Sequence, residues 1–265
     1  MEFQKGYHVL EELEVTDTDE PNGTFIRWKP DNEVFTDVNI PAKWLDRLCM
    51  SLSYVAGFNV TFNNKGTIKE YPKSNIFDVM QESTGDCARV HNFTHIVDGT
   101  GDICICDASV AIGPKGRGNE YYHNMVEVSG GSHSTAVSYA LSRFFFDVSH
   151  KYGVRIRESD YAGKFSFIIS SLANKMSPRG QTKDSVDDGY VTENLQDCMY
   201  NALYQEWEKG TDWLLKVINS TVEDAHNRIQ IAEMSKSLRE VEKVTKSLKA
   251  SNKFISCAAY EKKQY

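Results

Sequence analysis

The sequence predicts a mixed α+β fold that ends in one long helix. Two patterns alternate along the chain. In some segments apolar and β-branched residues occupy every second position, which is typical of strands with one buried face. In others, apolar residues recur at three- and four-residue spacing, which indicates amphipathic helices. The last helical stretch runs from Asp212 to about Ala250 and is much longer than the others.

Length and composition indicate a soluble globular protein. The chain has 265 residues, of which 40% are hydrophobic and 25% are charged. It contains no run of about 18 apolar residues, and its N-terminus lacks the apolar core of a signal peptide. We therefore expect a cytoplasmic protein without a membrane span. The formal net charge of −7 argues against a protein whose surface is generally basic and suited to bind phosphate groups.

The six cysteines are scattered, and no two of them have the C-x₂-C spacing of a zinc site. Cys104 and Cys106 would place both thiols on one face of a strand. We interpret the cysteines as buried free thiols and predict no metal site in this chain.

The first part of the chain is predicted to form strands around one amphipathic helix. Four strands are expected, at residues 3–11, 24–29, 58–62 and 67–71. The first two are expected to form a hairpin or to lie in one sheet, and the last two to pair around a tight turn. A helix should begin at Pro41, in its first turn, and end at Gly57. A short helix is expected at residues 76–81.

Polar, turn-prone residues at 82–86 predict a domain boundary. Beyond it we expect strands at residues 90–97, 102–112, 120–128 and 165–172, and helices at 134–152, 192–208 and 212–250. Gly153 is a suitable residue to end the first of these helices. At 1.5 Å per residue the last helix spans about 55 Å. It should therefore project beyond its own domain.

Two glycine-rich segments are candidates for binding phosphate through backbone N–H groups. Gly113–Gly118 carries Lys115 and Arg117, but it matches neither a P-loop nor a dinucleotide fingerprint, and we interpret it as a mobile hairpin tip. Ser129–His133 opens a helix. Here the glycines are interpreted as turn residues, with Ser132 or Ser134 as the N-cap.

The histidines have no partner that the sequence identifies. This holds for His91, His95, His123 and His133. We therefore predict neither a histidine metal set nor a nucleophile triad.

The loop Pro178–Lys183 presents an amide, a hydroxyl and an ammonium together, on Gln181, Thr182 and Lys183. A lysine is a point charge on a long stem, which suits it to reach a terminal phosphate and to stabilise charge in phosphoryl transfer. From residue chemistry alone, a solvated loop lysine remains the favoured interpretation.

Four motifs, in order, resemble the ATPase half of type IIA DNA topoisomerases, which includes DNA gyrase B, its topoisomerase IV counterpart and the phage-type large subunit. Residues 23–35 resemble the family's G-T-x-(I/V)-x-F-x-P-D-x-x-(I/V)-F signature. The helix ending at Gly57 and the strand after it resemble the helix and strand that come next in the family. Residues 130–133 are similar to G-G-T-H, and residues 181–183 match Q-T-K.

This resemblance implies a fold and a domain order. Residues 1–82 would be the end of a GHKL ATP-binding α/β sandwich. Residues 83–210 would be a transducer domain, in which helices pack on a four-stranded sheet with a left-handed βαβ crossover, against the usual preference. Residues 211–265 would be the exit helix and its tail toward the DNA-cleaving region.

The resemblance also implies roles for individual residues. Gln181 and Lys183 would be catalytic residues that contact the γ-phosphate of ATP, and Thr24 would line the adenine pocket. The cofactors of the assembled enzyme would be ATP and Mg²⁺. A basic bias on the last helix and its tail gives a weaker DNA-binding candidate, in which glutamates are interleaved. Its residues are Lys236, Arg239, Lys243, Lys246, Lys249 and Lys253.

Several family motifs do not appear. No E-x-x-x-N helix, D-x-G-x-G segment or glycine-rich lid precedes Gly23, and the chain contains neither an E-G-D-S motif nor a cleavage tyrosine after its last helix. We expect a middle piece of a topoisomerase that is inactive alone and acts on DNA, as a homodimer, with a chain carrying the ATP site and a TOPRIM cleavage subunit. An alternative is a non-catalytic adaptor built on the transducer fold. A related mismatch-repair or chaperone ATPase is a third interpretation.

Overall fold

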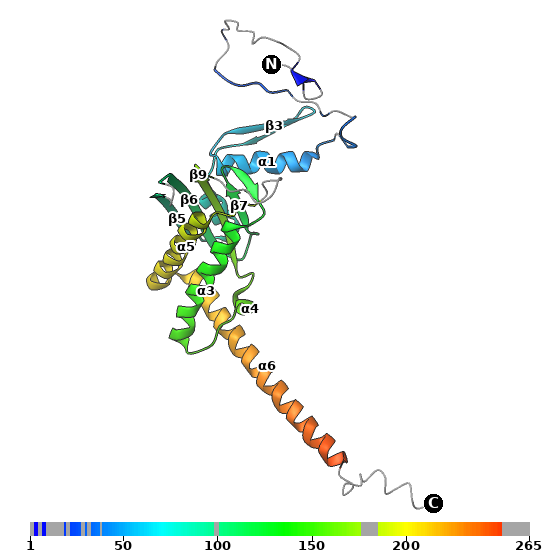
Figure 1. Ribbon diagram of the computed structural model, residues 1–265, viewed down its shortest axis with the longest axis vertical. Coiled ribbons are helices and arrows are strands. Elements are labelled where there is room, and N and C mark those ends of the chain that lie inside the picture. The colour runs from blue at the N-terminus through cyan, green and yellow to red at the C-terminus, as the bar shows by residue number, and fades with distance from the viewer. Residues whose placement is uncertain are drawn as a thin grey trace, which may run out of the picture.

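A computed structural model of the protein describes residues 3–4, 7–8, 19, 22–27, 30, 33–37, 39–97, 101–175 and 185–250. Its centre is a five-stranded sheet, and its most prominent feature is a long helix that projects from the body (Figure 1).

The sheet is mixed, which confirms the predicted α+β class. Its strands, in spatial order, are β5 (Ala88–Val97), β6 (Ile103–Pro114), β9 (Phe165–Ala173), β7 (Glu120–His123) and β8 (Val126–Val128). β7 and β9 run parallel, and the other neighbours are antiparallel. The handedness of the crossover between β7 and β9 stays a prediction.

The sheet has five strands rather than the four that the resemblance implied, because the segment expected as one strand at 120–128 turns back on itself. Asn124 and Met125 both have positive φ, at 48° and 67°. Two consecutive left-handed residues make the tight turn that suits the twist of a hairpin. Tyr122 then pairs with Glu127 across the turn.

Four helices belong to the second half of the chain: α3 (Ser132–Tyr152), α4 (Glu158–Tyr161), α5 (Gly189–Lys209) and α6 (Asp212–Ala250). The three long ones confirm the predicted helices, α6 with the predicted bounds and α3 and α5 with ends shifted by one to three residues, and α4 was not predicted. Gly153 has φ 64° and ends α3, as expected. No described helix has the length and apolarity needed to cross a membrane.

The elements before the sheet also follow the prediction: α1 (Ala42–Val55), β3 (Val60–Asn64), β4 (Thr67–Tyr71) and α2 (Ile76–Thr84). Pro41 is the N-cap of α1 rather than part of its first turn. Gly85 ends α2 with φ 84°. β3 and β4 form the expected antiparallel hairpin.

The prediction of a strand at 24–29 is wrong over its described part. Residues 22–27 have no regular secondary structure and pair with no described strand. Phe25 and Ile26, which alternation would place on opposite faces, are 89% and 82% exposed. The expected strand at 3–11 is represented by two short strands, β1 (Phe3–Gln4) and β2 (Tyr7–His8), which pair with each other. Residues 28–29 lie outside the described part.

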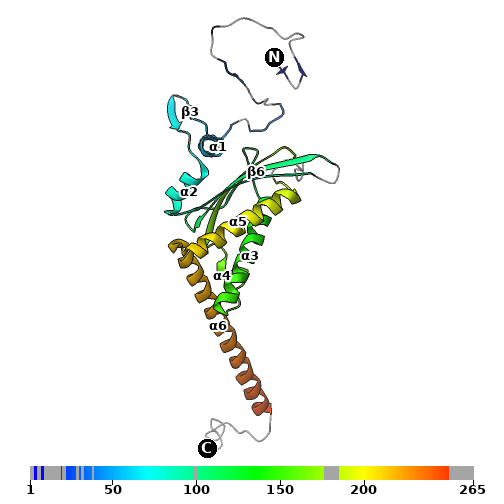
Figure 2. The ribbon, with the colours of Figure 1, turned by 90° about the vertical axis from the view of Figure 1, so that its left-hand side faces the viewer.

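Helices cover both faces of the sheet (Figure 2). α3, α5 and the start of α6 pack on one face, while α2 and the end of α1 pack on the other. The alternation of β6 divides its side chains between the two layers. Val110 and Ile112 face the first layer, and Ala111 faces the second. The sheet therefore separates α1 and α2 from α3, α5 and α6.

Candidate functional site

The predicted loop residues Gln181 and Lys183 lie in residues 176–184, outside the described part of the chain. The residues at its two ends, 174–175 and 185–188, are described and are called the base of the loop below. One end follows β9 and the other precedes α5.

Polar contacts hold the incoming end beside the start of β6. The Lys175 Nζ lies 2.7 Å from Asp102 Oδ2, and the hydroxyl of Tyr190 donates to the Lys175 carbonyl at 2.7 Å. The side-chain amide of Asn174 donates to the carbonyl of Ile103. Burial raises the pKa of Tyr190 to about 12, so its hydroxyl stays a donor at physiological pH. Lys175 is therefore tied both to the start of β6 and to the first turn of α5.

The outgoing end is fixed against the start of α3. Val186 forms an isolated parallel bridge with Gly131, and the backbone N–H of Ser132 donates to the Val186 carbonyl at 2.7 Å. The Ser132 hydroxyl accepts from the N–H of Asp188 at 2.8 Å and donates to the carbonyl of Asp188 at 3.0 Å. Ser132, Val186 and Asp188 are all buried. These bonds join the N-terminus of α3 to that of α5.

The expected N-cap of α3 is wrong. Gly131 is the N-cap, and no side chain caps the helix. The Ser132 hydroxyl is occupied by Asp188, and the Ser134 hydroxyl donates to the Gly131 carbonyl instead of accepting from an N–H. The loop therefore ends beside the N-termini of α3 and α5, whose first-turn N–H groups carry partial positive charge. The N–H of Ser132 already donates to Val186.

Two buried histidines share one serine beneath this base, and sequence reasoning missed them. His123 Nδ1 and His133 Nε2 each lie 2.8 Å from the Ser171 Oγ. Both rings are fully buried, and the Nε2 of His123 has no hydrogen-bond partner among the described residues. Burial lowers the pKa of His133 to about 4, and it also lowers the pKa of His123. The two residues are therefore neutral at pH 7.

This arrangement is not a nucleophile triad. A single hydroxyl can donate only one hydrogen, so at least one histidine must donate to Ser171. Ser171 is fully buried, which keeps a substrate away from its oxygen. The three residues come from β7, α3 and β9, and no spacing in the sequence connects them.

The glycine-rich loop Gly113–Gly118 is neither a phosphate cradle nor a hairpin tip. The N–H groups of Gly116 and Arg117 donate to the Ser166 Oγ at 3.2 and 3.1 Å, so they do not point at a ligand. β9 lies between β6 and β7, so the loop crosses the end of a strand instead of joining neighbours.

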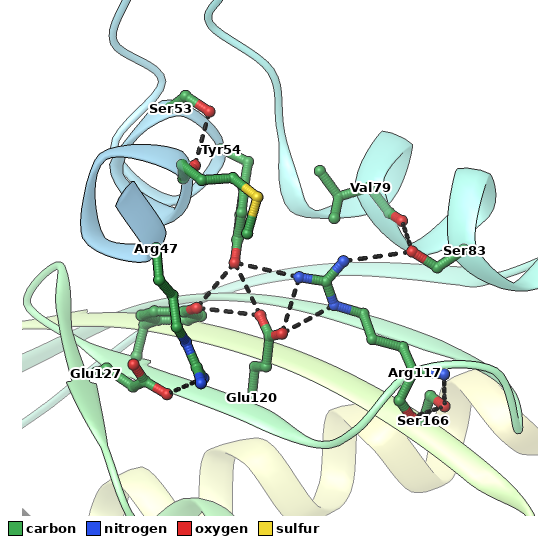
Figure 3. A network of polar contacts seen from close by, with 11 residues as sticks. Arg47, Ser53, Tyr54, Val79, Ser83, Arg117, Glu120, Glu127 and Ser166 are labelled. Atoms are coloured by element: carbon green, nitrogen blue, oxygen red, sulfur yellow. Dashed lines mark hydrogen bonds and ion pairs between the residues drawn. The ribbon is translucent and has the colours of Figure 1, made fainter. Parts of the chain in front are cut away.

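Arg117 instead organises a polar network between α1 and β7 (Figure 3). Its Nε and Nη2 lie 2.9 and 2.8 Å from Glu120 Oε1. The hydroxyls of Tyr54 and Tyr122 donate to Glu120 Oε2 at 2.8 and 3.0 Å. Burial raises the pKa of Tyr54 to about 12 and raises that of Tyr122 as well. Both phenols therefore remain protonated donors to one carboxylate.

A second ion pair joins the same two layers. Arg47 of α1 lies 2.5 Å from Glu127 of β8, and both side chains are about half exposed. Exposed pairs of this kind contribute roughly 0–1 kcal/mol. The buried Tyr54–Glu120 contact therefore dominates the polar attachment of α1 to the sheet.

The remaining predicted site residues are exposed. Thr24 lies in the irregular segment 22–27, and its role in an adenine pocket stays a prediction. Four of the basic residues of α6 have described, exposed side chains: Lys236, Arg239, Lys243 and Lys246. The side chain of Lys249 and all of Lys253 lie outside the described part. At 3.6 residues per turn the four share one face of the helix, with Glu240 at its edge.

The five described cysteines are free thiols, but only Cys104 and Cys106 are buried as predicted. Cys49, Cys87 and Cys198 are partly exposed. Burial raises the pKa of Cys198 to about 12, so this thiol is a poor nucleophile. Among the described residues, no group of three or more His, Cys, Asp or Glu side chains could hold a metal ion.

The sequence matches the family model of DNA gyrase B over residues 68–237. Two solved structures are similar in fold. The topoisomerase IV ATP-binding domain of Francisella tularensis, in complex with a small-molecule inhibitor, has a TM-score of 0.58 and 14% identity over 76% of this chain and 57% of that chain. The 43K ATPase domain of Thermus thermophilus gyrase B, in complex with an aminocoumarin, has a TM-score of 0.55 and 15% identity over 80% of this chain and 59% of that chain.

The chain thus spans less than two thirds of the length of each of these structures. No curated protein matches it in sequence.

Proposed function

The chain belongs to the DNA gyrase B family, and from this premise we propose that it is the transducing part of an ATP-dependent type II DNA topoisomerase. Residues 1–82 act as the end of the ATP-binding domain, 83–210 as the transducer, and 211–265 as the exit helix and tail. The observation that carries the proposal is the base of the loop at residues 176–184, which is held where the N-termini of α3 and α5 meet.

Gln181 and Lys183 reach from this base to the γ-phosphate of ATP. The lysine ammonium stabilises the negative charge that develops on the phosphoryl oxygens, and the glutamine amide donates to one of them. The two helix termini at the base add partial positive charge behind the lysine. Thr24 contacts the nucleotide at its adenine end.

ATP and Mg²⁺ are cofactors of the assembled enzyme. Bound Mg²⁺ neutralises phosphate charge, and we assign it to no residue of this chain, because the described residues offer no set of metal ligands. The adenine and magnesium sites are then supplied mainly by a partner segment or chain. We therefore propose that the chain alone does not hydrolyse ATP.

The network around Glu120 supports a mechanical link between the two proposed domains. Tyr54 belongs to the first, while Arg117, Glu120 and Tyr122 belong to the second. Beside it, Met80 of α2 is fully buried against Ile168 of β9. A movement of the first domain on ATP binding would therefore be transmitted to the sheet, and through it to α6 and the DNA-cleaving subunit.

The experiment is to replace the lysine in the assembled enzyme, with the segment or chain that carries the ATP site and the cleavage subunit present. Lys183→Ala should lower the ATPase rate about 100- to 1,000-fold, the usual effect of removing one transition-state donor, and lower strand passage with it. Lys209→Ala, at the exposed end of α5, is the matched control and should have no effect. An unchanged ATPase rate in Lys183→Ala would refute the assignment.

DNA is the proposed substrate of the assembly, which acts as a homodimer. The basic face of α6 is the candidate contact, and binding there should weaken steeply with added salt.

A second candidate function is a non-catalytic adaptor built on the same fold. It is favoured by the exposed apolar side chains of distal α6, such as Met234 and Leu238. Co-purification separates the two, since a topoisomerase part should bring down a chain with an ATP site and a chain with a cleavage tyrosine.

A further inference from the structure

The distal half of α6 carries an exposed apolar stripe. Its described members are Ile231, Met234, Leu238, Val241 and Val244, which are 58–69% exposed. The stripe begins just beyond Arg228, whose guanidinium bonds to both carboxylate oxygens of Asp160 and to the carbonyl of Arg155. From there on the helix stands clear of the body (Figures 1 and 2).

The body of the same chain cannot cover this stripe, because it lies on the opposite side of the helix. Leu214, Ile218 and Ala225 are the buried face of proximal α6. Leu238 lies thirteen residues beyond Ala225, which at about 100° per residue places it about 220° further around the axis. The face that meets the body continues as the basic side chains of Lys236 and Arg239.

The spacing of the stripe is that of a coiled-coil seam. Ile231, Met234, Leu238 and Val241 follow each other by three, four and three residues. Thr245 and Leu248 continue the same spacing in sequence. Apolar residues at a and d positions pack into the holes of a second helix, which makes a helix the fitting partner.

We infer that this partner is the α6 helix of a second copy of the chain, in parallel and in register. Each of the five side chains offers on the order of 100 Å² of apolar surface, so a symmetric pair would bury roughly 1,000 Å² in total. That area meets the lower limit for a specific interface.

Charge and length favour a parallel pair of identical helices. The positions beside the seam are mostly uncharged, and in a parallel pair Ser237 faces Glu242 of the second copy, so no like charges meet. An antiparallel pair would drive residues 245–250 of one helix against the body of the other chain, near Arg228. A parallel pair makes no such contact and turns both basic faces outward.

Sedimentation equilibrium of the full chain tests the pairing, with two matched aspartate variants. Leu238→Asp buries a charge in the seam and should weaken dimerisation by about 100-fold or more. Lys243→Asp makes a charge change on the opposite face and should leave the dimer intact. Circular dichroism should show that both variants keep their helix content.

A wild-type chain that stays monomeric at high micromolar concentration would overturn the inference. Equal effects of the two variants would overturn it as well, and so would a monomer whose stripe is protected from hydrogen exchange, since residues 251–265 or another segment would then be the occupant.

The register is tested by oxidative cross-linking. Val241→Cys should give a 241–241′ disulfide peptide that the wild-type chain lacks, whereas Lys243→Cys should not cross-link in this way. Cross-linking of 243 but not of 241 would contradict the parallel seam. The pairing does not depend on the ATP assignment, so the failure of either leaves the other standing.

Discussion

Gly131 lies so close to Val186 that a β-carbon on the glycine would stand 2.1 Å from the Val186 carbonyl oxygen. The glycine also has φ 73°, a conformation that other residues adopt at a cost. This contact closes the base of the loop at 176–184, so the base tolerates glycine alone at this position.

Gly131→Ala should therefore destabilise the chain by about 3 kcal/mol or more, since both the contact and the backbone strain act together. Urea denaturation measures the loss. Gly163→Ala is the matched control, because Gly163 has φ 70° but a β-carbon added there would meet nothing within 4 Å. Gly163→Ala should be destabilised only by the backbone strain of a left-handed alanine, about 1 kcal/mol. Equal losses in the two variants would contradict the close approach.

A second prediction concerns the attachment of α1 to the sheet. Tyr54→Phe removes the hydroxyl that donates to Glu120 but keeps the buried ring. It should cost about 1.5 kcal/mol, the usual range for a hydrogen bond to a charged group. The exposed Tyr139 supplies the control, since Tyr139→Phe should change the free energy of unfolding by less than about 0.5 kcal/mol.

The interaction energy between Tyr54 and Glu120 tests the contact more directly than the stability lost in the single variant. A double-mutant cycle of Tyr54→Phe with Glu120→Gln should give an interaction energy of about 1 kcal/mol. Strict additivity would mean that the two groups do not interact in solution.

The third prediction is a pH dependence from the buried histidines. The pKa of His133 is lowered to about 4 by burial, while in the unfolded chain it is about 6.5. Between these values the unfolded chain binds a proton that the folded chain does not. Stability should therefore be fully present above about pH 6.5 and fall as the pH drops toward 4, by about 3 kcal/mol for this residue.

Urea unfolding at a series of pH values measures this slope. His133→Gln, which keeps a polar side chain but cannot titrate, should flatten the slope between about pH 6.5 and 4. His123 has a lowered pKa as well, so part of the slope should remain. An unaltered slope in the variant would show that His133 is not the group that titrates.

A fourth prediction concerns the point at which α6 leaves the body. The Arg228 guanidinium holds the pKa of Asp160 below its usual value, so the ion pair stabilises the fold above about pH 4 and is lost as the pH falls through the lowered pKa. Arg228→Met leaves the buried Asp160 carboxylate without its counter-ion, with only the Arg157 N–H and the Ser159 hydroxyl as donors, and should cost about 2–3 kcal/mol at pH 7. Adding Asp160→Asn to Arg228→Met should restore part of the lost stability, because the carboxylate charge is removed. A double variant no more stable than Arg228→Met would contradict the pairing.

Periodicity and terminal residues in the sequence predicted most of the regular elements. Pro41 and Gly57 bracket α1, and Gly153 marks the end of α3 because only a left-handed residue fits there. Local signals sufficed in these cases because the residues that decide the structure are neighbours in the chain.

Where the sequence predictions differ from the structure, the difference has a physical reason. Met125 adopts a left-handed conformation that its side chain does not favour, so the β7–β8 turn carried no glycine signal. The segment at 24–27 alternates like a strand, but alternation requires a neighbouring strand, and none is described. The meeting of His123, His133 and Ser171 depends on tertiary packing of three distant segments, which no spacing encodes.

Gln181, Lys183 and Thr24 were reached only through resemblance to a family, and their roles remain proposals. The base of the loop that carries Gln181 and Lys183 was not predicted at all, since Ser132 was expected to cap its own helix and instead bonds to Asp188.

The central claim is that Lys183 contacts the γ-phosphate, and its chemical reactivity tests this directly. In the assembled enzyme, acylation of lysines is measured by peptide mass spectrometry with a non-hydrolysable ATP analogue or with ADP. Lys183 should be protected by the triphosphate analogue and not by ADP, while Lys209 should react equally in both. Equal acylation of Lys183 with either nucleotide would contradict the claim.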